Sequence, residues 1–116
     1  MALKCRWTLE AESAFHELEA AARASMSRRS RDGKAKSSRN EGLFKQVEKC
    51  IRLLHADPRH PGLRTHEFSS IENPFDSRQK VFEAYVQNRT PGAYRVFWCY
   101  GPGSQEITII AITRHP

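Results

Sequence analysis

Three runs of strand-forming residues follow one another in the last third of this sequence. They cover residues 80–86, 93–100 and 106–113, and all are rich in β-branched and aromatic side chains. The connections between them, residues 88–92 and 101–104, are short and contain proline and glycine. Short connections make neighbouring strands antiparallel. The sequence therefore predicts a three-stranded antiparallel meander.

Two helices are predicted before the meander. Residues 3–8 alternate weakly between apolar and polar positions, which indicates a short first strand. Glu10 and Glu12 then place negative charge in the first turn of a helix, where it is favourable. Asn40 is a suitable N-cap for a second helix, which the prolines and the glycine of residues 57–62 end. The apolar faces comprise Ala14, Phe15, Leu18, Ala21 and Ala22 in the first helix, and Leu43, Val47, Cys50, Ile51 and Leu54 in the second.

These elements and the chain length define the predicted fold. A chain of 116 residues with 39% hydrophobic residues is one domain with a modest core. The segment from Arg59 to Arg78 is irregular and connects the second helix to the sheet. We expect an α+β fold in which two N-terminal helices pack on one face of a small antiparallel sheet, in the order β-α-α-β-β-β. Residues 1–116 then form a single domain.

The net charge of +6 is concentrated in one segment. Between Arg23 and Asn40 lie seven basic residues and one acid, whereas the rest of the chain has 12 of each sign. Residues 25–40 also contain five serines and no apolar periodicity, which predicts a mobile, exposed connection. Such a segment either follows an RNA backbone through sequence-independent contacts or only keeps the chain soluble, and its share of the charge favours RNA. The arginines expected to contact phosphates in it are Arg28, Arg29 and Arg31.

Cysteine usage and the start of the chain predict a compartment. Cys5, Cys50 and Cys99 are widely spaced, odd in number and outside any zinc-binding pattern, as expected of thiols in a reducing environment. No apolar stretch is long enough for a signal peptide or a membrane span. We therefore expect a cytoplasmic protein with no membrane partner.

The middle strand carries a candidate phosphate-binding residue. Alternation places Arg95 and Phe97 on one face and the better core residues on the other, so Arg95 should stand on the face that the helices leave open. Phe97 beside it is a possible platform for a nucleic-acid base. The alternative, weighted equally, is that Arg95 forms a structural ion pair with Glu83 on the neighbouring strand.

The last strand brings a second basic group and an imidazole. Alternation places Ile107, Ile109, Ala111, Thr113 and His115 on one face, and Arg114 on the other. A lone histidine near a chain end is more often a solvated tail residue, but here Arg95 and Arg114 accompany it. A cation that holds a phosphate and an imidazole that transfers a proton near neutral pH are what RNA cleavage requires.

Other polar residues extend this candidate surface. Five histidines without regular pairing predict no metal site. A lysine binds phosphate as a point charge, a glutamate can act as a base, and a tyrosine can stack or donate a proton. The residues concerned are Lys80, Glu83 and Tyr85 on the first strand of the meander, with Arg64 and His66 in the irregular segment.

Several segments together resemble the RelE/ParE superfamily of bacterial toxins. The similarity covers most of the chain from about Leu43 onward and the first helix more loosely. Tyr94-Arg95-Val96, followed by a turn and an apolar last strand, is its most telling part. The segments that carry it are Asp57-Pro-Arg-His-Pro-Gly-Leu-Arg64, Val81-Phe-Glu-Ala-Tyr85, Ala93-Tyr-Arg-Val-Phe97 and Ile107-Thr-Ile-Ile-Ala-Ile112.

The resemblance implies a function and partners. RelE-like members cut mRNA on the ribosome without metal or cofactor, and a cognate antitoxin silences them. It implies that Arg95 binds the scissile phosphate, that His115 is the general acid and that Arg114 supports them, although Arg114 is an alternative for the acid position. Only Lys80 is available where RelE-like members place a lysine pair, and the C-terminal helix and tyrosine of some members are missing. A ParE-like inhibitor of DNA gyrase, or an inactive member that binds RNA or an antitoxin, remains an alternative.

Overall fold

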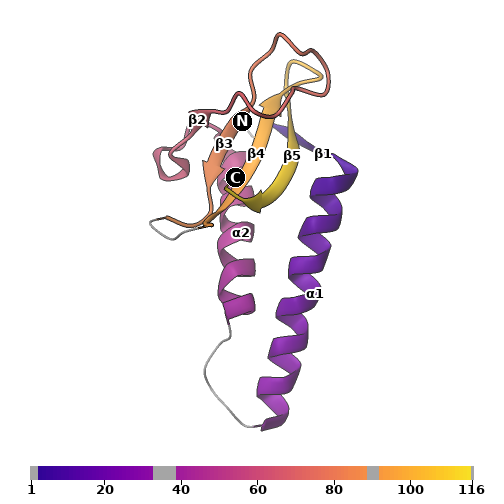
Figure 1. Cartoon of the computed structure of the whole chain (residues 1–116), viewed down its shortest axis with the longest axis vertical. Helices are drawn as coiled ribbons and strands as arrows, with labels where there is room; N and C mark the ends of the chain where they lie inside the picture. Colours follow the sequence, from indigo (N-terminus) through magenta and orange to yellow (C-terminus); the bar gives the residue numbers. More distant parts are fainter. Residues whose placement is uncertain (1–2, 33–38, 89–91, 116) are drawn as a thin grey trace.

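The structure is a computed structural model that describes residues 3–32, 39–88 and 92–115. A five-stranded sheet packs on a pair of helices, and the helices extend well beyond the sheet (Figure 1). The fold class predicted from the sequence is confirmed. The elements are β1 (Lys4–Trp7), α1 (Leu9–Asp32), α2 (Arg39–Ala56), the 3₁₀ turn η1 (Pro61–Leu63), β2 (His66–Glu67), β3 (Phe82–Tyr85), β4 (Tyr94–Tyr100) and β5 (Glu106–Arg114).

The sheet is mixed rather than purely antiparallel, which corrects one expectation. Its strand order is β1-β5-β4-β3-β2, and β3, β4 and β5 form the predicted meander. The first strand lies beside the last and parallel to it, with Lys4 opposite Glu106 and Trp7 opposite Ile109. The segment predicted to be irregular contributes a two-residue edge strand, in which His66 pairs with Glu83.

The helices are longer than the apolar pattern indicates. The prediction of an irregular connection over residues 25–40 is wrong for residues 25–32, which continue α1, and α2 begins at Arg39. Ser25 is buried although it is polar, so the apolar pattern used for the prediction does not mark this part of the helix. Arginine is also a good helix former, which explains why a basic segment extends the helix. The remaining part of the predicted mobile connection, residues 33–38, lies outside the described residues.

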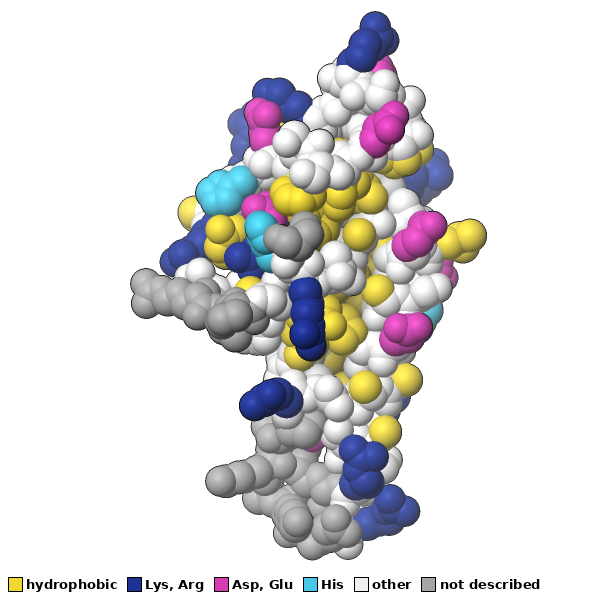
Figure 2. Space-filling view, viewed as in Figure 1, with side chains coloured by type: hydrophobic (Ala, Val, Ile, Leu, Met, Phe, Trp, Pro, Cys, Tyr) yellow, Lys and Arg dark blue, Asp and Glu magenta, His cyan; other side chains and the backbone are white. Residues whose placement is uncertain are grey.

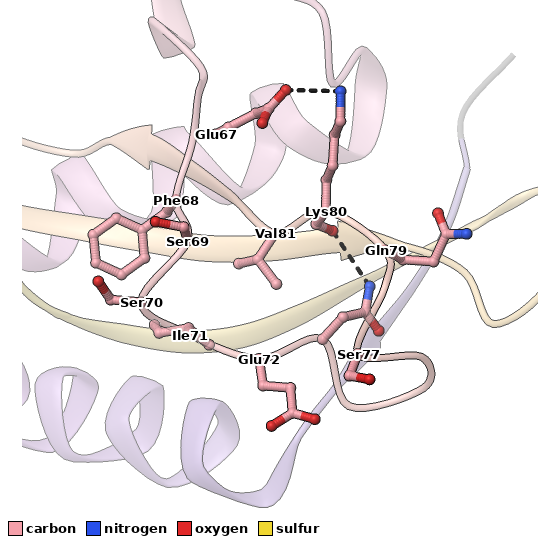
Figure 3. Close-up of a pocket in the computed structure, with 11 residues that line it drawn as sticks. Glu67, Phe68, Ser69, Ser70, Ile71, Glu72, Ser77, Gln79, Lys80 and Val81 are labelled. Carbon is pink, nitrogen blue, oxygen red and sulfur yellow. Dashed lines mark hydrogen bonds and ion pairs between the residues drawn. The ribbon is translucent and has the colours of Figure 1, made fainter.

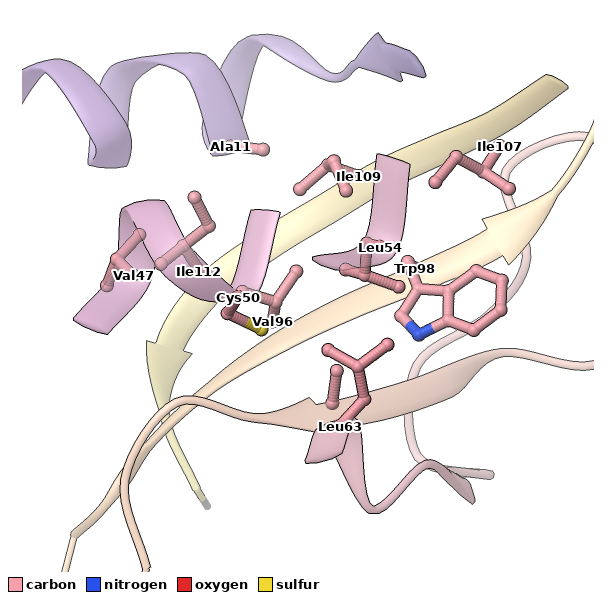
Figure 4. Close-up of a cluster of buried hydrophobic side chains, with 11 residues drawn as sticks. Ala11, Val47, Cys50, Leu54, Leu63, Val96, Trp98, Ile107, Ile109 and Ile112 are labelled. Carbon is pink, nitrogen blue, oxygen red and sulfur yellow. The ribbon is translucent and has the colours of Figure 1, made fainter. Parts of the chain in front are cut away.

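The core lies between the helices and one face of the sheet (Figure 4). The predicted alternation of β4 is confirmed, because Val96 and Trp98 are buried against the helices. Val47, Cys50 and Leu54 from α2 and Ala11 from α1 supply the other side of the core. The opposite face of the sheet is therefore the one on which Arg95 was expected to stand.

A bulge in β5 changes which residues share a face. The register runs from Phe97 opposite Ala111 to Trp98 opposite Ile109, so Ile110 has no partner in the ladder. One inserted residue reverses the alternation beyond it. The expectation that residues 107, 109, 111, 113 and 115 share one face is therefore wrong. Ile112 lies on the core face with Ile107 and Ile109.

Candidate active site on the open face of the sheet

A buried carboxylate joins the two residues singled out from the sequence. Oε2 of Glu83 lies 3.9 Å from Nε of Arg95 and 3.4 Å from Nε2 of His115. Glu83 and Arg95 are diagonal neighbours on the same face, because Glu83 lies opposite Phe97 and Arg95 is two residues from Phe97 along β4. We call these three residues the Glu83 cluster. It combines a cation, an anion and an imidazole on the face of the sheet opposite the helices.

Arg95 is held firmly inside this cluster. Its Nη1 donates hydrogen bonds to the carbonyl oxygens of Gln87 at 2.6 Å and Tyr94 at 3.1 Å. Its Cζ lies 3.7 Å from the ring centroid of Tyr85, close enough for a cation–π interaction. Only 9% of the Arg95 side chain is exposed. The pairing with Glu83 that the sequence left as an alternative is thus present, although 3.9 Å is too long for a hydrogen bond.

His115 is the accessible member of the cluster. Its backbone N–H donates to the carbonyl of Ala93 at 2.8 Å, which ties the residue to the start of β4. Its ring packs edge-on against Phe68, with the centroids 6.1 Å apart, and 42% of its side chain is exposed. The carboxylate of Glu83 lies close enough to the imidazole of His115 to form an ion pair with it when the ring is protonated. Figure 2 shows histidine side chains and hydrophobic surface close together on this part of the molecule.

The aromatic residues are arranged differently from the prediction. Phe97 is fully buried beneath Phe68, with the ring centroids 4.7 Å apart, so Phe97 offers no surface on which a base could stack. Phe68 is only partly buried and takes that exposed position. Phe68 lies in a segment without hydrophobic periodicity, so no pattern in the sequence marks it as part of the site. It could be found only from the structure.

Tyr85 and His66 complete the open face. Tyr85 carries the Arg95 guanidinium on one side, and its ring meets that of His66 with the centroids 5.5 Å apart. The pairing of His66 with Glu83 in the β2–β3 ladder places both side chains on the same face. The structure therefore places His66, one of the residues expected to extend the candidate surface, as a second exposed histidine beside the cluster.

Other predicted residues lie elsewhere. Arg114 is on the helix side of the sheet, where its Cζ is 6.0 Å from the ring centroid of Tyr94 and it shares a hollow with Leu18 of α1. Arg114 and His115 both follow the bulge in β5, so they still point to opposite faces of the sheet, as predicted. Lys80 pairs with Glu67 through a 2.8 Å contact. The last of the sheet-side residues, Arg64, is exposed and follows η1 with a positive φ of 49°.

The basic arginines lie at the far end of α1. Arg28 and Arg31 are exposed there, and the side chain of Arg29 lies outside the described residues. Figure 2 shows lysine and arginine side chains along this helical end. These arginines are therefore not part of the Glu83 cluster and belong to a separate surface.

The thiols and the acidic groups give no sign of another centre. Burial raises the pKa of the Cys50 thiol to about 12 and that of Cys99 to about 11, and it also raises the pKa of Cys5. Among the residues that the structure describes, no three His, Cys, Asp or Glu side chains gather closely enough to hold a metal ion. No helix in the same ranges is long and apolar enough to cross a bilayer.

Comparison with solved structures identifies the fold. A YoeB/ParE toxin from Agrobacterium tumefaciens superposes with a TM-score of 0.60 at 10% identity, over 98% of this chain and 100% of that chain. A YoeB dimer from Staphylococcus aureus gives 0.57 at 8% identity, over 100% of both chains. An archaeal RelE–RelB complex from Pyrococcus horikoshii OT3 gives 0.54 at 11% identity, over 98% of this chain and 96% of that chain.

The sequence matches no protein-family model and no curated protein. At such low identities the superpositions concern the backbone alone. The chain has the fold of the RelE/ParE superfamily toxins.

Proposed function

We propose that this protein is the toxin of a toxin–antitoxin pair and acts as a metal-independent, ribosome-dependent mRNA endoribonuclease. The observation that carries the proposal is the Glu83 cluster, in which an exposed imidazole is held by a buried carboxylate next to a fixed cation. The fold shared with YoeB and RelE proteins supports it. The same proposal places the protein in the cytoplasm, where translated mRNA is found.

The proposed reaction needs only proton transfers and charge stabilisation. The ribose 2′-oxygen attacks the adjacent phosphorus, the bond from phosphorus to the 5′-oxygen breaks, and a 2′,3′-cyclic phosphate and a 5′-hydroxyl result. A base accepts the proton of the 2′-hydroxyl, and an acid supplies one to the leaving 5′-oxygen. Positive charge near the phosphate stabilises the transition state.

The exposure of each side chain suggests its role in this reaction. His115 is accessible and serves as the general acid, while Glu83 orients its ring. Arg95 is largely buried, so it stabilises negative charge on the phosphate through its field. His66 is the other exposed imidazole on this face and serves as the base.

The decisive experiment compares histidine variants in cells. His115→Ala should relieve the growth arrest caused by induced expression and lower transcript cleavage by about 10² or more, because it removes the proton donor. Transcript 5′ ends are mapped with translation running and with translation blocked. His55→Ala is the matched control, because His55 is also exposed but lies at the end of α2.

Two other outcomes would identify the alternatives. Unchanged arrest in both His115→Ala and His66→Ala, together with gyrase inhibition by the purified protein, indicates a ParE-like inhibitor. Absence of arrest with the natural sequence indicates an inactive member that only binds RNA or an antitoxin. Either result contradicts the nuclease.

An antitoxin is the proposed protein partner. One of the structural neighbours is a complex of RelE with RelB, which supports a partner for this chain. Co-expression with the small acidic protein expected to be encoded next to this gene should restore growth and yield a stable complex. Failure of every neighbouring reading frame to do so would contradict this part of the proposal.

A further inference from the structure

A cleft of about 640 Å³ lies directly beside the Glu83 cluster. It is formed by the segment between β2 and β3, and Val81 lies between Phe68 and Ile71 on one side and Gln79 on the other (Figure 3). Phe68 belongs to both places, because it lines the cleft and its ring also contacts His115. The volume is in the range of about 300–1,000 Å³ typical of sites for small ligands.

The cleft is built into the fold. The buried side chain of Asn73 accepts hydrogen bonds from the backbone N–H groups of Phe75 at 2.9 Å and Asp76 at 3.3 Å, and its amide donates to the carbonyl of Lys80 at 3.3 Å. The N–H of Phe68 donates to the carbonyl of Val81 at 2.8 Å, which closes the segment at its base. These bonds fix the walls before any ligand arrives.

The chemistry of the lining disfavours a phosphate. Its one cation, Lys80, is already paired with Glu67, and Glu72 adds a second negative charge. The rest of the rim consists of hydroxyl and amide groups that both donate and accept hydrogen bonds, namely Ser69, Ser70, Ser77 and Gln79. An apolar floor with hydroxyl and amide groups on the rim suits a flat, uncharged ring that carries hydrogen-bonding edges.

We infer that this cleft holds one unpaired nucleobase of the RNA substrate, next to the phosphate at the Glu83 cluster. The inference rests on the proposed function. A nucleotide has its charge at the phosphate and its hydrogen-bonding edges on the base, and Phe68 joins the Glu83 cluster to the cleft, since it contacts His115 and lines the cleft. Phe68 supplies the stacking surface that the buried Phe97 cannot. The cleft, rather than the catalytic groups, then sets the base preference at the cut.

Binding is tested with RNA that cannot be cleaved. A 2′-O-methyl trinucleotide is titrated into the intact protein, and the backbone amide signals of residues 68–72 and 79–81 are followed by NMR. The matched probe has the same phosphates and an abasic central nucleotide. Loss of the base should weaken binding about tenfold and abolish these shifts. Equal binding of the two probes, or no binding of either at millimolar concentration, would overturn the inference.

Base preference is tested by mapping cuts. Gln79→Ala and Ser70→Ala alter the exposed rim without disturbing the core and should change the base distribution next to the cut. Gln105→Ala, on the turn before β5, is the control and should leave the distribution unchanged. An unchanged distribution in both rim variants refutes the base site but keeps the nuclease. Base-dependent binding without any cleavage refutes the nuclease but keeps the base site.

Discussion

Glu83 is the residue on which the proposed site depends. Its carboxylate is 8% exposed and lies between a guanidinium and an imidazole. Removing an ionised group from water costs several kcal/mol, so such a group persists in a folded protein only where partners compensate for it. The cluster is therefore a balanced unit, and the loss of one member should affect the others.

Glu83→Ala should lower the free energy of unfolding by about 3–5 kcal/mol, because it leaves the buried charge of Arg95 without a counter-ion. Glu83→Gln keeps the shape and should cost less. Urea unfolding measures both, with Glu48→Gln on the exposed side of α2 as a control expected within about 0.5 kcal/mol of the natural sequence. If Glu83→Ala unfolds like the control, the backbone carbonyls alone compensate Arg95.

The thiols give a prediction about pH. The folded state holds Cys50 and Cys99 in their neutral form, with pKa values raised from 9.0 to about 12 and about 11. Their contribution to stability is therefore complete below pH 9 and is lost as the pH rises toward 11 to 12. Iodoacetamide at pH 8.5 should leave both unmodified in the folded protein and modify all three cysteines in urea. Rapid labelling of Cys50 without urea would contradict the burial.

At the scale of elements, Thr8 connects the start of α1 to the bulge in β5. Its hydroxyl accepts a hydrogen bond from the N–H of Ala11 at 3.1 Å, as an N-cap does, and donates to the carbonyl of the bulged Ile110 at 2.7 Å. Its backbone N–H also donates to the carbonyl of Ile109 at 3.0 Å. The helix and the irregular point of the strand are thereby fixed together.

Thr8→Ala should destabilise the protein by about 1–2 kcal/mol, since it removes the cap and the bond to the bulge together. Thr8→Ser retains the hydroxyl and should recover most of this loss. Thermal unfolding of the two variants measures the difference. Equal melting temperatures for the two would show that the methyl group, and not the hydroxyl, is what matters at this position.

The elements that the sequence predicted well are those with a regular period. The faces of β4 followed from alternation, and this alone placed Arg95 on the face away from the helices, but its burial there did not follow. The bulge could not be predicted from the sequence. Ile109 and Ile110 are both apolar, so the pattern does not show which of them is the inserted residue. The extension of α1 was missed since its last turns carry serine and arginine instead of an apolar stripe. Phe68 covers Phe97 and comes from a segment without hydrophobic periodicity. The burial of Phe97 and the partial exposure of Phe68 were therefore not predictable from the sequence.

At the scale of the whole molecule, the two proposed surfaces are separated along its length. The chain measures 51 × 28 × 25 Å, with the sheet at one end and the projecting helices at the other (Figure 1). The Glu83 cluster lies on the sheet, whereas Arg28 and Arg31 lie near the end of α1. Contacts at the helical end can strengthen binding to a large RNA assembly without touching the cluster.

Replacing Arg28 and Arg31 by glutamine should weaken association with ribosomes and reduce the dependence of log affinity on log salt by about one unit per arginine. The natural sequence should bind ribosomes weakly at higher salt. There the loss of two contacts should bring the affinity of the variant below detection. Sedimentation at several salt concentrations measures this, and cleavage by the bound fraction should be unchanged. Association that is indifferent to the change would mean that the arginines only keep the chain soluble.

The parallel pairing of β1 with β5 has a consequence for how the chain acquires its shape. Lys4 and Glu106 are partners across the sheet, so the first strand has no neighbour until β5 has been synthesised. Contacts between distant parts of a sequence form slowly, because a long loop must close before they do. The helical pair can form early, but β5 must arrive before β1 is paired and before His115 reaches Glu83. The proposed site would thus be incomplete in a nascent chain until β5 has emerged and docked.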